Sequence, residues 1–430
     1  MKIAAVTFGC KVNQYETACI VNDFLQAGYE VVDFAEPADV YLINTCTVTN
    51  RTDFKSRNAL RKALSRKKQD QCIKIIATGC YAQRDPAALR KMGSVDLVID
   101  NGHKDKILSI MQGADYLFRD IFSCNSYCEH KTSLFPDRTR AFLKIQDGCN
   151  YECAYCAVPL GRGKSRSRRK ENIFAQVSDL SESGYREFVL VGVNLGLYGH
   201  DIYQNYRLAQ LIADLEKIPT VDLLRLSSIE PLFWDDELIS IIHHSKKVAP
   251  HFHIPLQSGS DNILFQMGRN YTSKQFCDIL QKLRRIIPAA AIGLDVIAGL
   301  PGEGEPEFLQ TFNLLQNLDY TYLHVFPYSP RPGTRAYSMS DKVKGDVIKI
   351  RTDKLNDLSR RKKKDYASWL LEQKPVLTGI VEKKSQGYWT MLSDHYLRTY
   401  FRSQASWQGK KVHIIPTELF LDGVKGIISD

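Results

Sequence analysis

Apolar and polar positions alternate regularly along the first third of the chain. Short apolar runs, as expected of buried strands, are each followed by a segment with helical spacing, such as Asn13 to Gln26. Because strands that alternate with helices form parallel sheets, the pattern predicts an N-terminal α/β domain. Its strands are expected at residues 2–9, 39–45, 73–79 and 96–100.

After residue 141, strand-like runs and helical stretches alternate again, and more strands are predicted than in the first third. Six strand-like runs with helical stretches between them predict a partial or open (βα)6 barrel of the TIM type. A polar, strongly charged helix around Lys342 to Leu371 follows, and Pro375 ends it. The six strands are expected at residues 142–145, 187–192, 223–227, 251–256, 292–298 and 320–326.

The last part of the chain changes to a period-two alternation of β-branched and aromatic residues, which predicts a small five-stranded barrel of the OB kind. Three domains also suit a chain of 430 residues, at about 150 residues per domain. The predicted boundaries are 1–117 for the N-terminal domain, 118–136 for a linker, 137–367 for the (βα)6 domain and 370–430 for the β-barrel.

Composition narrows the class of protein. With 44% hydrophobic and 25% charged residues, the chain is typical of a folded globular protein, and no apolar run is long enough to cross a membrane. The N-terminus leads directly into a strand without a cleavage site, so we expect a cytoplasmic protein with no membrane contact. The formal net charge of +10 permits an anionic partner.

The eleven cysteines carry the first chemical signal. Their odd number and uneven spacing argue against a disulfide framework and favour metal or cluster ligands. Cys149, Cys153 and Cys156 lie close together after a predicted strand. Three thiolates can hold three irons of a [4Fe-4S] cluster and leave the fourth iron open to a chelating small molecule. A structural zinc site is the alternative, but zinc takes four ligands and no fourth one stands nearby.

A second set of cysteines is spread along the N-terminal domain. Cys10, Cys46 and Cys80 each directly follow a predicted strand, and loops after neighbouring parallel strands gather at one edge of a sheet. We therefore expect these three distant thiols to meet. Burial as three unrelated core thiols is the alternative. The pair Cys124 and Cys128 falls in the linker without further ligands and is assigned no role.

Both cysteine sets resemble those of a known family. The loop Cys149-x3-Cys153-x2-Cys156, with the aromatic Tyr155 before its last cysteine, is similar to the cluster loop of radical S-adenosylmethionine (SAM) enzymes. The segments GCKVNQYE, NTCTV and TGCYAQ, which contain Cys10, Cys46 and Cys80, resemble the N-terminal domain of the methylthiotransferases. That family joins this domain to a radical SAM barrel and a C-terminal TRAM module, so the resemblance covers essentially the whole chain.

The resemblance implies the cofactors. They are SAM and two [4Fe-4S] clusters, an auxiliary one on Cys10, Cys46 and Cys80 and a radical SAM one on the later set, with a flavodoxin-like or ferredoxin-like electron donor. No catalytic residue beyond the cluster ligands is implied. The segments VGVN, RLSSIEP and HIPLQSGS also look like those of the family, although strand-end caps or turns would suit the same residues. They imply cofactor contacts for Tyr155, Asn194, Ser228, Glu230 and Gln257.

Basic residues concentrate after the radical SAM loop and again in the C-terminal module, where aromatic residues are interleaved with them. Cations suit phosphate contact and aromatic rings suit base stacking, so the pattern favours an RNA partner, although basic runs are often solvated faces. Likeness to TRAM modules points to tRNA and its anticodon stem-loop. The candidate RNA contacts are Arg162, Lys164, Arg166, Arg168, Arg169, Lys383, Arg398 and Arg402.

The resemblance also implies an activity. SAM would methylate a sulfur on the auxiliary cluster, and a radical from a second SAM would remove the C2 hydrogen of adenosine-37 beside the anticodon. The segments CKVNQYE and VGVN resemble the branch that acts on N6-threonylcarbamoyladenosine. The alternatives are the isopentenyladenosine branch, the branch that modifies a ribosomal-protein aspartate, and a metal-containing RNA-binding protein without catalysis.

Overall fold

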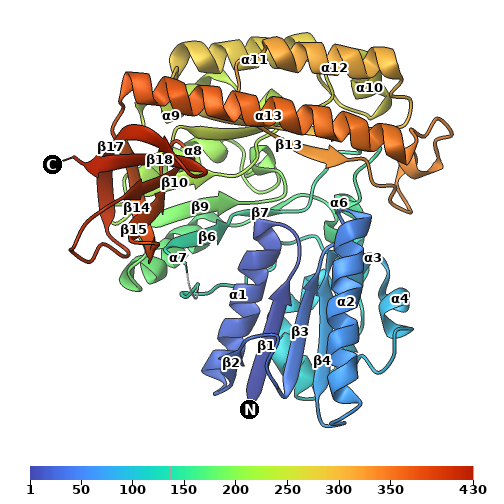
Figure 1. Cartoon of the computed structure of the whole chain (residues 1–430). Helices are drawn as coiled ribbons and strands as arrows, with labels where there is room; N and C mark the ends of the chain where they lie inside the picture. The colour runs from blue at the N-terminus through green and yellow to red at the C-terminus, as the bar shows by residue number, and fades with distance from the viewer. Residues whose placement is uncertain (136–137, 430) are drawn as a thin grey trace.

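Five parallel strands form the N-terminal sheet, in the order β2-β1-β3-β4-β5 (Figure 1). The computed structural model describes residues 1–135 and 138–429, so the boundary predicted at residues 136 and 137 lies outside the described residues. Four strands lie where the pattern predicts them, whereas β2 is too short to show a periodicity. The bounds are β1 (Lys2–Thr7), β2 (Glu30–Val32), β3 (Val40–Thr45), β4 (Lys74–Gly79), β5 (Leu97–Val98), α1 (Lys11–Gln26), α2 (Asn50–Lys67), α3 (Cys80–Arg84), α4 (Pro86–Arg90) and α5 (Ile107–Met111).

The carboxyl ends of β1, β3 and β4 point toward the middle domain (Figure 1). The helix that follows β3, α2, begins at a capping box in which Thr49 Oγ1 accepts from Thr52 N at 3.2 Å and Thr52 Oγ1 accepts from Thr49 N at 3.1 Å. Such caps satisfy backbone groups that the first helical turn leaves open. The N-terminal sheet therefore presents its loops to the middle domain.

Six parallel strands form the middle domain, as the alternation predicts, but they divide into two sheets of three, β6-β9-β10 and β11-β12-β13. The halves meet where Leu224 N donates to Lys247 O at 2.7 Å. The strands are β6 (Arg140–Lys144), β9 (Glu187–Val191), β10 (Leu223–Leu226), β11 (His251–Gln257), β12 (Ala291–Ala298) and β13 (Tyr322–Pro327). A further pair, β7 (Gln146–Asp147) and β8 (Arg166–Ser167), flanks the radical SAM loop.

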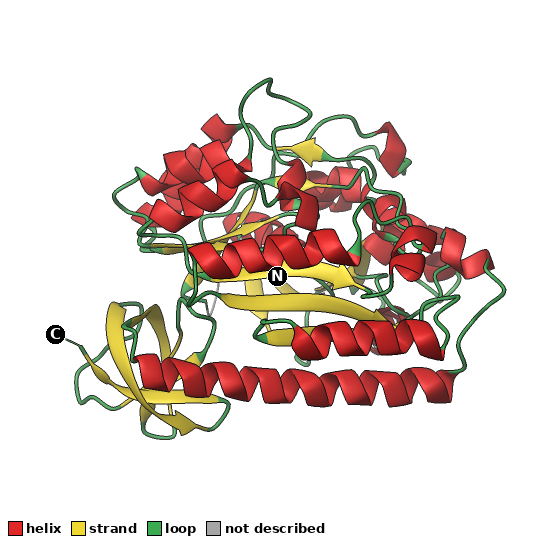
Figure 2. Cartoon of the chain, turned by 90° about the horizontal axis from the view of Figure 1, so that it is seen from above, coloured by secondary structure: helices red, strands yellow, loops and turns green. Residues whose placement is uncertain are grey.

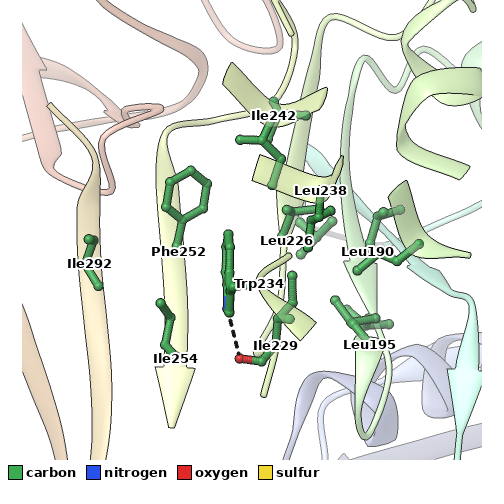
Figure 3. Packing of buried hydrophobic residues seen from close by; sticks show 14 of the residues in the cluster. Leu190, Leu195, Leu226, Ile229, Trp234, Leu238, Ile242, Phe252, Ile254 and Ile292 are labelled. Atoms are coloured by element: carbon green, nitrogen blue, oxygen red, sulfur yellow. Dashed lines mark hydrogen bonds between the residues drawn. The ribbon is translucent and has the colours of Figure 1, made fainter. Parts of the chain in front are cut away.

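Helices cover the outer face of these strands. Figure 3 shows Phe252 and Ile254 of β11 next to Trp234, with Ile292 on the neighbouring strand, and Trp234 Nε1 donates to Ile229 O at 3.3 Å. Burying these side chains supplies the main apolar driving force for the fold. The helices are α6 (Val158–Arg162), α7 (Lys170–Glu182), α8 (Leu208–Glu216), α9 (Asp236–His244), α10 (Asp261–Gln266), α11 (Ser273–Ile286), α12 (Glu305–Asn317) and α13 (Gly345–Gln373).

The long helix α13 runs beside β13 and reaches the C-terminal barrel (Figures 1 and 2). It ends where Lys374 adopts a left-handed conformation with φ of 49° and Pro375 follows, as predicted. No helix in the described ranges is both long and apolar enough to cross a membrane.

The C-terminal module is a closed five-stranded barrel in the order β14-β15-β16-β18-β17, with β16 and β18 parallel and the other pairs antiparallel. The predicted OB-like barrel is confirmed. It docks on the middle domain where Arg225 donates to Leu392 O at 2.9 Å and Ser393 O at 3.0 Å. The strands are β14 (Leu377–Ser385), β15 (Tyr388–Leu392), β16 (Arg398–Phe401), β17 (Lys411–Phe420) and β18 (Gly423–Ile428).

Candidate active site

Three thiols meet on the loop between β7 and α6. Cys149, Cys153 and Cys156 line one cavity of about 540 Å³, together with Lys164 and Arg335. The loop begins at Gly148, whose φ is 72° and where a Cβ would lie 1.9 Å from Lys164 O, so only glycine fits this turn. The three thiols of the predicted set thus line one cavity.

Hydrogen bonds to sulfur surround this loop. Tyr151 N donates to Cys149 Sγ at 3.4 Å, and Val158 N donates to Cys156 Sγ at 3.4 Å. Burial, and then repulsion by the neighbouring thiols, raises the pKa of Cys156 to about 12. Thiolates therefore need a positive partner here, and an iron–sulfur cluster, whose sulfur ligands commonly accept such bonds, supplies one. The donor set fits a cluster.

Arg269 is a functional candidate that sequence reasoning missed. Its Nη1 donates to Cys153 Sγ at 3.1 Å and lies 3.5 Å from Tyr155 Oη, and its Nη2 donates to the carboxylate of Glu230. Burial raises the pKa of Glu230, and the charge of Arg269 opposes the rise. The only sequence signal for Arg269 is a single cation after α10, in the stretch MGRNY.

The residues expected to contact a cofactor lie at the carboxyl ends of the strands. The buried Asn194 donates to Cys149 Sγ at 3.9 Å, and its Oδ1 has no hydrogen-bond partner among the described residues. Gln257, at a bulge of β11, has a φ of 64°. Such a conformation in a non-glycine residue occurs at helix ends and turns, as at Lys374, and also at functional sites. Ser228 is half-buried after β10.

The N-terminal thiols also converge. A Cβ on Gly9 would lie 2.6 Å from Cys46 Sγ, so the loop that carries Cys10 runs against Cys46. Burial raises the pKa of Cys46 to about 12, with repulsion from Cys80 and Cys10 adding to the rise. Cys80 lies at the start of α3, against which α6 packs so closely that a Cβ on Gly161 would meet Cys80 Cβ at 3.0 Å.

Neither set of thiols is arranged to bind a single metal ion. Within residues 1–135 and 138–429, no three His, Cys, Asp or Glu side chains form such a group. A cubane cluster needs a wider arrangement, because each thiolate binds a different iron. All eleven cysteines lie in the described part of the chain and are free thiols.

A buried network of charges connects the two sets. Glu16 of α1 accepts from Arg162 Nη1 at 2.7 Å, from Lys144 Nζ at 2.7 Å, and from Lys104. Burial alone would raise the pKa of Glu16, but these cations hold it well below its usual value. Arg162 Nη1 also donates to Asp147 Oδ1 at 2.9 Å, two residues before Cys149. The network therefore spans both cysteine loops.

Asn13 fixes the N-terminal end of this network. Its Nδ2 donates to Phe8 O at 2.8 Å and Thr45 O at 3.1 Å, which are the residues before the Gly9-Cys10 turn and before Cys46. Its Oδ1 accepts from Arg162 Nη2 at 2.5 Å. One asparagine thus ties the loops of Cys10 and Cys46 to Arg162, the last residue of α6, and α6 itself packs against Cys80.

Three of the expected RNA contacts are wrong. Arg162, Arg166 and Arg168 are buried, with exposed fractions of 2%, 6% and 0%. Arg168 forms an ion pair with Glu129, and Arg166 donates to Arg162 O at 2.8 Å. Their charges are satisfied inside the protein and cannot reach a phosphate. The basic run therefore mostly stabilises the fold. Its acidic partners, such as Glu129, lie far away in the sequence and are brought beside it by folding.

The other candidates remain accessible. Lys164, Arg169, Lys383 and Arg402 are exposed, and the half-buried Arg398 pairs with Glu382. A cavity of about 1280 Å³ lies between the start of the middle domain and the C-terminal barrel, and it is lined by cations and tyrosines. The lining includes Arg138, Arg140, Lys383, Arg398, Tyr388 and Tyr400.

The inner face of the middle domain is polar, which the strand pattern did not reveal. His253 Nε2 lies 2.9 Å from Asp295 Oδ1, and the rings of His253 and His324 meet edge to face at 5.1 Å. At one end of this face His251 stacks on Tyr396 of the C-terminal barrel at 3.9 Å. The C-terminal barrel thus contributes to the surroundings of this face.

Comparisons with known proteins identify the class. The uncharacterized protein family UPF0004 matches residues 2–100, and the radical SAM superfamily matches residues 143–315. Among solved structures, the radical S-adenosylmethionine methyltransferase TsrM from Kitasatospora setae has the same fold, with a TM-score of 0.59 and 15% identity over 78% of this chain and 77% of that chain. The fold, the cysteine loop and the superfamily match define a radical SAM enzyme.

Curated relatives narrow the class further. The chain is 40% identical to the threonylcarbamoyladenosine tRNA methylthiotransferase MtaB of Bacillus subtilis, over 96% of this chain and 93% of the relative. It is 39% identical to that of Aquifex aeolicus, over 90% and 97%. It is 32% identical to the tRNA-2-methylthio-N(6)-dimethylallyladenosine synthase of Natranaerobius thermophilus, over 88% and 86%. The chain belongs to the radical SAM methylthiotransferase family.

Membership confirms part of the cofactor prediction. The enzyme uses SAM and a [4Fe-4S] cluster, and the loop of Cys149, Cys153 and Cys156 fits that cluster. The auxiliary cluster and the residues assigned to each cofactor stay predictions.

We predict that Arg162→Met destabilises the protein. The change leaves Glu16 and Asp147 buried with fewer cations, and breaking a buried ion pair costs about 3–5 kcal/mol. Chemical unfolding of the full-length protein without cofactors should show this loss. The matched control is Arg169→Met, at an exposed arginine nearby, which should change stability by less than about 0.5 kcal/mol. Equal stability of the two variants would contradict the role of the network.

Proposed function

We propose that the protein converts N6-threonylcarbamoyladenosine to its 2-methylthio derivative at adenosine-37 of tRNA, and that it works in the cytoplasm, where tRNA is found. The observation that carries this proposal is the convergence of two sets of three cysteines, from separate domains, on one buried network. Relatives named for threonylcarbamoyladenosine reach 40% identity, whereas those named for dimethylallyladenosine reach 32%, which favours the first substrate.

We assign the auxiliary [4Fe-4S] cluster to Cys10, Cys46 and Cys80, and the radical SAM cluster to the later three cysteines. When bound, the clusters and SAM supply the electron, the radical that removes the C2 hydrogen, and the sulfur that replaces it. A flavodoxin-like or ferredoxin-like protein is the proposed electron donor. The protein itself holds these groups in line and excludes water.

Individual side chains have separate tasks in this scheme. Arg269 places one positive charge against Cys153 and holds the Glu230 carboxylate. The free Oδ1 of Asn194 can accept from an amine or hydroxyl of SAM. Ser228, Glu230 and Gln257 lie at or just after the carboxyl ends of β10 and β11. Such ends are where barrel enzymes build active sites.

The substrate RNA needs an external surface as well. Exposed cations at Lys164, Arg169, Lys383 and Arg402 are proposed to bind its phosphates, and Tyr388 offers a ring for stacking. Arg402 already lies over the Tyr388 ring, with 4.6 Å between its Cζ and the ring centroid. The target base then has to leave its stack in the anticodon loop, which costs a few kcal/mol or less.

We predict that the reconstituted protein holds about eight irons and that a variant with alanine at Cys149, Cys153 and Cys156 holds about four, since each set of three cysteines binds one cluster of four irons. Anaerobic iron and sulfide analysis measures this. The matched control replaces Cys19, Cys72 and Cys277 by alanine and should keep about eight. Zinc in place of iron would support an RNA-binding protein without catalysis.

A second prediction separates the two clusters. Cys10→Ala should still cleave SAM to 5′-deoxyadenosine, because the radical SAM loop is intact, but should form no methylthio nucleoside. Nucleoside analysis of treated tRNA by mass spectrometry reads the product. If the variant still forms the methylthio product, the assignment of Cys10 to the auxiliary cluster is wrong. Product on isopentenyladenosine rather than threonylcarbamoyladenosine would change the substrate branch only.

The RNA surface is testable through salt. The double variant Lys383→Met, Arg402→Met should bind an anticodon stem-loop more weakly and lower the slope of log K against log salt by about 2, since each phosphate contact adds about one unit. The control Lys274→Met removes an exposed cation from α11, on the helical side of the middle domain. An unchanged slope in the double variant would remove the C-terminal barrel from the interface.

A further inference from the structure

A second buried ion pair joins the N-terminal domain to the middle domain. Asp53, in the first turn of α2, accepts from Arg331 Nη2 at 2.5 Å and from Arg84 Nη2 at 3.1 Å. Asp53 and Arg331 are only 4% and 3% exposed. Beside them, Asn50 N donates to Ser329 Oγ at 2.9 Å. The loop that follows β13 is therefore bound to the start of α2 at two points.

The Asp53 carboxylate also connects the elements that carry two of the N-terminal cysteines. The helix α2 begins shortly after Cys46, and Arg84 is the last residue of α3, which begins at Cys80. Because one carboxylate accepts from both arginines, α2, α3 and the loop after β13 meet at one point. A shift of that loop would therefore disturb the helices beside Cys46 and Cys80.

The loop after β13 is bound at its other end to the radical SAM loop. Ala336 N donates to Ala154 O at 2.8 Å, and Ala154 directly follows Cys153. Between Arg331 and Ala336 the chain is held by a turn in which Thr334 Oγ1 donates to Arg331 O at 2.7 Å. A short, internally bonded segment thus connects the N-terminal domain to the backbone of the radical SAM loop.

The two interdomain networks lie on opposite edges of the incomplete barrel. The strands β6 and β13 are the outermost strands of the two three-stranded sheets. The network around Glu16 includes Lys144, the last residue of β6, whereas Arg331 follows β13. The N-terminal domain is thus fastened at both edges of the barrel opening.

The ion pair between Asp53 and Arg331 is costly to bury. Asp53 Oδ1 and Arg331 Nε and Nη1 have no hydrogen-bond partner among the described residues. A buried ion pair that is incompletely hydrogen-bonded adds little net stability compared with apolar side chains of similar volume. Breaking it is nevertheless unfavourable, because an uncompensated buried charge remains. Such a pair therefore restricts geometry more than it adds stability.

We propose that Arg331 and Asp53 are positioning residues that hold the radical SAM loop in one placement relative to Cys46 and Cys80. Both act through the backbone, Arg331 through the loop that ends at Ala336 and Asp53 through α2. This inference rests on the proposed function, in which two clusters must serve the same adenosine. It assigns the control of their relative placement to a contact on the β13 edge, separate from the network around Glu16.

Hydrogen exchange of the full-length protein without cofactors tests the connection. Arg331→Met keeps Asp53 paired with Arg84, so we expect the variant to fold. The amide of Ala336 should exchange about tenfold faster or more, because opening the loop no longer breaks a charge-assisted hydrogen bond. Unchanged exchange at Ala336 would overturn the proposal.

Two further variants complete this experiment. The matched control Asp96→Asn removes an ion pair with the buried Lys67 inside the N-terminal domain, and exchange at Ala336 should stay as in wild type. Should Arg331→Met not fold, Ser329→Ala removes only the acceptor of Asn50 N, and faster exchange at Ala336 is expected again.

A second readout separates positioning from stability. In the reconstituted enzyme, the ratio of 5′-deoxyadenosine to methylthio nucleoside does not depend on how much of the protein is folded. Arg331→Met and Asp53→Asn should raise this ratio about tenfold or more, because a misplacement of about 1 Å can cost about 100-fold in rate. Arg331→Lys keeps a cation opposite Asp53 and should stay near the wild-type ratio, as should Asp96→Asn.

The outcomes distinguish this inference from the function on which it rests. An unchanged ratio in Arg331→Met overturns the positioning role. An equal rise in Asp96→Asn also overturns it, because the effect would then follow from lower stability alone. If wild type forms no methylthio nucleoside, the proposed function fails, whereas the exchange of Ala336 still tests the connection between the domains.

Discussion

The buried carboxylate of Glu16 is the constraint on which the rest of the site depends. It lies at the junction of two domains, and its cations come from both: Lys104 from the N-terminal domain, Lys144 and Arg162 from the middle domain. A carboxylate removed from water is tolerated only when it is paired and hydrogen-bonded, so the domains cannot separate or slide without exposing unpaired charges. A purely apolar contact would tolerate small shifts. This network fixes one relative placement of the two cysteine sets, which the proposed chemistry between two clusters would require.

The split of the middle domain into two three-stranded sheets leaves its inner face open, and the other domains complete it. Tyr396 of the C-terminal barrel stacks on His251 at one end, while α1 of the N-terminal domain packs on the β6 side. A closed barrel of eight strands would fill this space with side chains. With six strands the barrel stays incomplete, and each neighbouring domain contributes groups beside it. Substrate recognition and cluster placement are therefore properties of the assembled chain rather than of a single domain.

Sequence patterns predicted the strands, the two cysteine sets and the OB-like barrel because each depends on local spacing that a fold of this class preserves. The prediction that the basic run after the radical SAM loop contacts RNA was wrong at Arg162 and Arg168 for a physical reason. A charge run is typical of a solvated face, and nothing near Arg162 in the sequence reveals Glu16, 146 residues away, or Glu129 for Arg168. Arg269 was missed for the same reason. It is a single cation whose role depends on Cys153 and Glu230, which only the fold brings beside it, and it stands in no periodic pattern.

The burial of Arg162, Arg166 and Arg168 also affects how the protein can bind RNA. Once the buried arginines are removed from the basic surface, the accessible cations form two separate groups, near the radical SAM loop at Lys164 and Arg169 and on the C-terminal barrel at Lys383 and Arg402. A duplex stem held by one group alone could slide along it, because phosphate contacts carry little sequence information. On the proposed function, contact at two separated groups would fix the register of the stem relative to the cysteine loop. Affinity would then come from these outer cations, and the choice of base from the groups at the carboxyl ends of the barrel strands.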